Sequence, residues 1–155
     1  MKKLLLSYLL LAVLVLTGCA TVPMASPEAD QKAKAFATPS SDMASLYIFR
    51  DSQLGAALKK MVKIDGQNIG ETAPNTYFHI FAKPGKRTLS TESEFSDNSL
   101  EVSLEPGKVH YVRNYMKMGL FIGGANLEIV DGSEAKQAIH ESCKLAQPVS
   151  DKSIY

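Results

Sequence analysis

The pattern of hydrophobic and polar positions divides the chain into three parts. Residues 4–16 form an almost purely apolar run, broken only by Ser7 and Tyr8. Residues 20–45 are rich in Ala, Ser, Pro and Thr and have no sustained apolar period of 3.6 or 2 residues, which is typical of a flexible linker; the alternative for part of it is a short helix around residues 29–37, which would be marginal alone. After Ser45, short apolar or alternating runs are separated by turn dipeptides. This last pattern predicts an antiparallel β protein.

The turns in this third part have clear local signals. Asp65-Gly66 tolerates the positive φ of a tight hairpin, and Pro-Gly-Lys occurs at 84–86 and again at 106–108, where Gly supplies the positive φ of a type II turn. Leu100, Val102 and Leu104 alternate with polar residues, as expected for a strand with one buried face. We predict about seven strands, at residues 46–50, 61–64, 68–71, 77–82, 100–104, 109–115 and 126–130.

The C-terminal part of the chain predicts one short helix. Asp131 is followed three residues later by Glu134, which is a helix N-terminal signal, and Ala135 and Ile139 recur at helical spacing. The predicted fold class is therefore mainly β, a single antiparallel β-sandwich-like domain with one short C-terminal helix. We expect a leader at 1–18, a lipidated N-terminus and flexible tether at 19–45, the domain at 46–146 and a loose tail at 147–155.

A series of short motifs resembles a known family. The run LYIFR…VKIDGQNIGE…YFHIFAKPGKRTL…LEVSLEPGKVHYVR, which begins near Ser45, has the order of elements of the bacterial lipoprotein family catalogued as domain of unknown function 2846. The resemblance covers roughly residues 45–130. It implies a β-sandwich-like module on a lipid anchor and brings no catalytic residues to transfer.

The first nineteen residues resemble the leader of a bacterial lipoprotein. Lys2 and Lys3 precede the apolar run, which is shorter than the roughly 20 residues of a membrane-spanning helix. The following Leu-Thr-Gly18-Cys19 resembles a lipobox. The resemblance implies cleavage between Gly18 and Cys19, with an S-diacylglycerol and an N-acyl chain such as palmitate on Cys19. The alternative is an uncleaved anchor helix with an incidental cysteine.

The residues around the lipobox also bear on location and partners. Ala20 follows Cys19 where an aspartate would favour the inner membrane, so the resemblance implies the outer membrane, facing the periplasm. Removing Lys2 and Lys3 with the leader lowers the formal net charge from +1 to −1, which leaves no basic excess for a nucleic acid. We expect the membrane as a partner through the anchor, an envelope protein or the cell wall as another, and no cofactor.

The sequence contains no recognisable catalytic motif. It has no G-x-S-x-G elbow, P-loop or dinucleotide fingerprint, and the spacing of His79, His110 and His140 does not predict a metal site. We therefore predict a non-enzymatic binding or structural module in the envelope. The alternative is an envelope hydrolase with a site assembled from dispersed residues such as His79, His110 and Asp97.

One apolar segment between two predicted strands is a candidate docking patch. Residues 116–124 read MKMGLFIGG, and Leu120, Phe121 and Ile122 are the side chains that a partner would contact. The alternative, which the pattern favours, is a loop folded over the core or a further strand.

Overall fold

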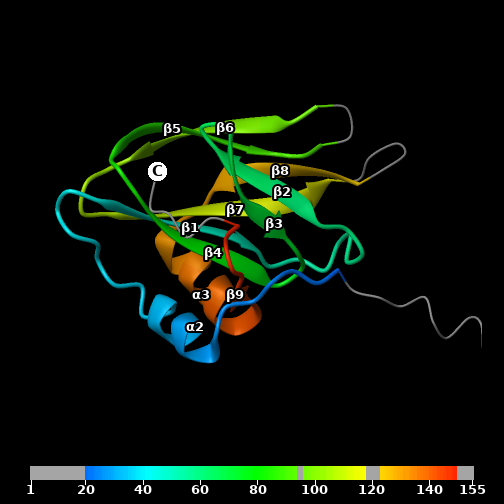
Figure 1. Cartoon of the computed structure of the whole chain (residues 1–155), viewed down its shortest axis with the longest axis horizontal. Coiled ribbons are helices and arrows are strands. Elements are labelled where there is room, and N and C mark those ends of the chain that lie inside the picture. The colour runs from blue at the N-terminus through cyan, green and yellow to red at the C-terminus, as the bar shows by residue number, and fades with distance from the viewer. Residues whose placement is uncertain (1–19, 94–95, 118–122, 150–155) are drawn as a thin grey trace, which may run out of the picture.

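Two β-sheets stacked on each other form most of the protein (Figure 1). The computed structural model describes residues 20–93, 96–117 and 123–149. Over these residues, one sheet has the strand order β8-β7-β1-β4-β9 and the other the order β3-β2-β5-β6. The elements are α2 (Pro27–Ala33), β1 (Ala44–Arg50), β2 (Lys60–Ile64), β3 (Gln67–Thr72), β4 (Thr76–Ala82), β5 (Gly85–Thr91), β6 (Asn98–Leu104), β7 (Val109–Lys117), β8 (Gly124–Ile129), α3 (Gly132–Ser142) and β9 (Lys144–Leu145).

Successive side chains on each strand point alternately into the space between the two sheets and away from it. Leu46 and Ile48 of β1 lie in one apolar cluster with Val62 and Leu89 of the other sheet, all fully buried. This arrangement confirms the prediction of a mainly β, sandwich-like domain with one C-terminal helix. It differs from a purely antiparallel sheet, because β1 pairs in parallel with β7.

The outer face of the five-stranded sheet is covered by the helices, so β1 is buried along its whole length. Tyr47 and Phe49 of β1 pack in a second cluster with Ala135 and Ile139 of α3. The predicted N-terminal signal starts this helix, since the carboxylate of Asp131 accepts a hydrogen bond from the backbone N–H of Ser133 at 2.8 Å.

Residues 20–43, predicted as part of a flexible tether, instead lie along the domain. The backbone N–H of Ala20 donates to the carbonyl of Ala56 at 2.9 Å, and that of Ala25 donates to Leu145 at 3.0 Å. Ser26 caps α2, whose last residue, Ala33, is 5% exposed. The contacts that hold this segment come from residues far away in the sequence, which a search for local periodicity does not detect.

Two strands were not among those predicted. Before Leu89, β5 is mostly exposed and has no large apolar residue, so its apolar alternation is short. β9 has only two residues and is a strand because it pairs in parallel with Thr76 and Tyr77 of β4. The start of the predicted loose tail is also held, since the backbone N–H of Val149 donates to the carbonyl of Ile69 at 2.7 Å. Residues 150–155 lie outside the described residues.

Candidate functional site

A groove of about 830 Å³ opens on the outer face of the five-stranded sheet. Its floor is formed by Tyr47 of β1 and by His79 and Phe81 of β4. α2 and residues 37–43 line it on the other side. Phe81 is 43% exposed, which is unusual for a phenylalanine on a covered sheet face. The groove is therefore mainly apolar and accessible to solvent.

His79 is the polar side chain at the centre of this floor. Its ring stacks on Tyr47 with the centroids 4.2 Å apart and lies 4.9 Å from the ring of Phe81. Its Nε2 is 2.9 Å from the hydroxyl oxygen of Ser45. Burial lowers the pKa of His79 from its ordinary value of 6.5 to about 4, because removal from water penalises the charged ring. His79 is therefore neutral at physiological pH.

The wall formed by α2 is fixed to the sheet by two tyrosine hydroxyls. Tyr47 donates to the carbonyl of Ala33 at 2.6 Å, and Tyr77 donates to the carboxylate of Asp30 at 2.9 Å. Burial raises the pKa of both phenols, so both hydroxyls keep the protons that they donate. The groove thus has a preformed shape, with one wall supplied by a segment that the sequence pattern predicted to be flexible.

The Ser45–His79 contact has the residue types of a nucleophile and its general base. Ser45 is fully buried, however, and does not line the groove, so a substrate in the groove does not reach its hydroxyl. No hydrogen bond joins a carboxylate to the His79 ring in the described part of the chain, and a pKa of about 4 makes the ring a weak base at neutral pH. The contact orients the imidazole at the groove floor.

The structure does not bring His79, His110 and Asp97 together. β1 lies between β4 and β7, where His79 is opposite Tyr47 and His110 is opposite Leu46. Since neighbours on a strand point to opposite faces, the two histidines lie on opposite faces of the same sheet. His110 accepts a hydrogen bond from the backbone of Glu105, and Asp97 pairs with Lys63 of the other sheet at 2.7 Å.

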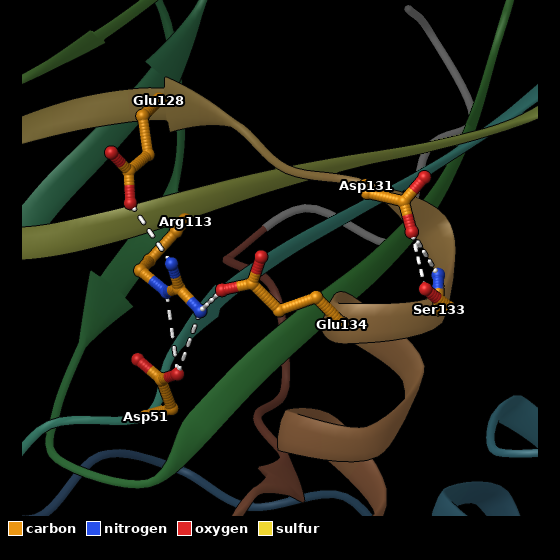
Figure 2. A network of polar contacts seen from close by, with 6 residues as sticks. All are labelled: Asp51, Arg113, Glu128, Asp131, Ser133 and Glu134. Atoms are coloured by element: carbon orange, nitrogen blue, oxygen red, sulfur yellow. Dashed lines mark hydrogen bonds and ion pairs between the residues drawn. The ribbon is translucent and has the colours of Figure 1, made fainter.

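A second polar cluster centres on Arg113 of β7, at the other end of the outer face (Figure 2). Its guanidinium lies 3.2 Å from Asp51, 3.0 Å from Glu128 and 2.8 Å from Glu134, and it stacks over the ring of Phe49. These carboxylates come from the residue that follows β1, from β8 and from α3. The cluster joins β7 to the residue after β1, to β8 and to α3, and we interpret it as structural because its cation is already paired with three anions.

The other predicted site residues have simple positions. Cys143 is 1% exposed, with its sulfur 3.7 Å from the carbonyl of Arg50, and burial raises the pKa of the thiol to about 12.

Gly18 and Cys19 of the cleavage and lipidation site, and Leu120, Phe121 and Ile122 of the docking patch, lie outside the described residues. Among the residues that the structure describes, no group of three His, Cys, Asp or Glu side chains has the geometry of a metal site. None of the described helices has the length and apolar character to cross a bilayer.

The fold and the groove define a small two-sheet β module. The model of the family "Protein of unknown function (DUF2846)" matches residues 40–125, from the segment before β1 into the start of β8. A protein of Haemophilus influenzae, named only as uncharacterized, is 50% identical over 126 residues, which cover 81% of this chain and 75% of that protein. The chain therefore belongs to the DUF2846 family, which confirms the resemblance seen in its motifs. No solved structure matches it.

Proposed function

We propose that the protein is a lipid-anchored cell-envelope lipoprotein whose β domain binds a partner in the groove and does not catalyse a reaction. The observation that carries this proposal is the groove itself, a preformed apolar depression with an accessible aromatic side chain and a neutral histidine on its floor. Its volume is in the range of small-molecule pockets, roughly 300–1,000 Å³.

The chemistry of the lining indicates an apolar ligand with few polar atoms. Phe81, Met43 and Pro39 offer carbon surface, while Lys32 is the one cationic residue in the lining. Phosphate and carboxylate ligands are usually held by several converging cations or N–H donors, which this lining does not supply. An apolar or aromatic side chain presented by an envelope protein fits the groove better than an anion.

Photocrosslinking from intact envelopes tests the groove. A photoreactive amino acid at Phe81 is expected to give a covalent adduct with a protein partner. The matched control is the same amino acid at Glu101 of β6, whose side chain is 66% exposed on the other sheet. Equal adduct patterns at the two positions, or no adduct at Phe81 under conditions that trap known envelope complexes, would contradict binding in the groove.

The anchor is tested separately at Cys19. The wild-type protein is expected to incorporate a labelled fatty acid and to lose its leader. Cys19→Ser lacks the sulfur that accepts the diacylglycerol, so it is expected to keep the leader and to run as the larger precursor. Maturation of Cys19→Ser to normal size would show that the leader is an ordinary secretory signal.

A hydrolase is the second candidate, and the observation that favours it is the 2.9 Å contact between Ser45 and His79. A fluorophosphonate probe, which reacts with activated serines, distinguishes the two. We expect no labelling of the folded protein, since the Ser45 hydroxyl is buried. Labelling that is lost in both Ser45→Ala and His79→Gln would establish the hydrolase instead.

A further inference from the structure

The loop between β1 and β2, residues 51–59, lies beside the first described residue of the chain (Figure 1). The hydrogen bond from the N–H of Ala20 to the carbonyl of Ala56, 2.9 Å long, fixes this contact. Cys19 immediately precedes Ala20 in the sequence. The acyl chains that the proposed function assigns to Cys19 would therefore be attached one residue away from this contact, which would bring the loop close to the lipid surface.

The composition of the loop suits such a surface. Residues 52–58 read SQLGAAL and contain no charged side chain. Leu54 is 47% exposed. An exposed leucine among small residues offers apolar contact to the region where headgroups meet acyl chains.

A buried cation keeps the loop in this shape. The guanidinium of Arg50 is fully buried and donates to the carbonyls of Leu54, Gly55 and Leu58 at 2.8–2.9 Å. The residue at the start of the loop, Asp51, is held by Arg113 (Figure 2). Since the backbone is fixed at both ends and in the middle, Leu54 does not fold back into the core.

We propose that residues 51–59 form a membrane-contact loop that seats the domain on the lipid surface beside its own anchor. The inference rests on the proposed lipidation of Cys19. The anchor holds the protein at the membrane, and the loop sets its orientation there, with the side chain of Leu54 entering the interface. A membrane surface is the occupant that the position of residue 20 favours, because a protein partner at this loop would compete with the bilayer for the same space.

The test places an environment-sensitive fluorophore on the loop of the full lipidated protein. Leu54→Cys and Ala57→Cys carry the label at two loop positions, and the native Cys143 is buried and remains unlabelled. Lys86→Cys is the matched control, since its side chain is 79% exposed at the opposite end of the sandwich. Each protein is reconstituted into vesicles of phosphatidylethanolamine and phosphatidylglycerol, with or without doxyl-labelled phospholipid.

We expect the emission of the label on Leu54→Cys and Ala57→Cys to shift to the blue in vesicles and to be quenched by the doxyl lipid. We expect neither change for the label on Lys86→Cys. Fatty-acid incorporation is measured on the same samples, so the two proposals are separated. A lipidated protein whose loop positions behave like Lys86 would overturn the membrane-contact loop while leaving the anchor intact. A protein without incorporated fatty acid would overturn the proposed anchor and, with it, this inference.

Discussion

His79 is expected to make the protein less stable at pH 5 than at pH 7. The folded state holds its pKa at about 4, below the ordinary value of 6.5, because the ring is buried against Tyr47. Between these two values the unfolded chain binds more protons than the folded chain, so the free energy of unfolding rises with pH. The stability that the neutral ring contributes is present above pH 6.5 and is lost as the pH falls towards 4.

The magnitude follows from the two pKa values. A difference of one pKa unit corresponds to about 1.4 kcal/mol. At pH 5 the solution is roughly 1.5 pH units below the ordinary pKa of histidine but still above the pKa of His79 in the folded state. The expected loss in the free energy of unfolding from His79 is therefore about 2 kcal/mol. This is a large part of the total stability of a small domain, which is typically about 5–15 kcal/mol.

The assay is urea unfolding at both pH values, with far-ultraviolet circular dichroism as the signal because the chain has no tryptophan. His79→Gln is the control, since its amide retains a polar atom for Ser45 but does not titrate. Other groups, including His110 and His140, are present in both proteins and cancel in the comparison. If His79→Gln loses as much stability as the wild type between pH 7 and pH 5, the neutral, buried state of His79 is refuted.

Three further changes test other parts of the fold. Arg50→Met removes the donor to three loop carbonyls, so it is expected to lower the free energy of unfolding in urea by about 3 kcal/mol. It is also expected to speed the hydrogen exchange of residues 51–59, and unchanged exchange would show that the loop keeps its shape without Arg50. Cys143 is expected to resist a bulky maleimide in the folded protein and to react after unfolding, and rapid labelling of the native state would contradict its burial. Gly70→Ala places a Cβ 2.7 Å from the ring of Phe78 and is expected to lower stability by roughly 1–3 kcal/mol, whereas a neutral effect would mean that the ring moves freely.

The elements that could be predicted are those with a local cause. The hairpin turn at Asp65-Gly66 has φ of 48° and 79°, and Gly107 of the second Pro-Gly-Lys turn has a φ of 70°, as their residue types require. The helix α3 starts at the predicted Asp131 because a side-chain cap needs only the neighbouring residues. The seven predicted strands followed from short apolar or alternating runs, which are also local patterns.

The groove could not be predicted because its parts meet only in space. Its wall, α2, is seven residues long and would be marginal by itself, so its stability depends on the contacts of Tyr47 and Tyr77 with its backbone and side chains. Ser26 followed by Pro27 is a start signal that the sequence did offer. The placement of His79 and His110 on opposite faces likewise depends on the registers of β4 and β7 against β1, since a shift of one residue in either pairing would bring both rings to one face.

The two ends of β1 relate the groove to the membrane-contact loop. Ser45, near the start of the strand, contacts His79 on the groove floor, whereas Arg50, at its end, binds the loop. A strand rises about 3.3 Å per residue, so these positions are roughly 17 Å apart along the strand. A domain seated on lipid through the loop would therefore turn the Phe81 end of the groove away from the headgroups and towards the periplasm.

A freely jointed tether would instead present the groove in all orientations, and the photoreactive group at Phe81 would then react with lipid as well as protein. Adducts at Phe81 that contain protein and no phospholipid are the outcome that the seated orientation predicts, and phospholipid adducts there would refute it.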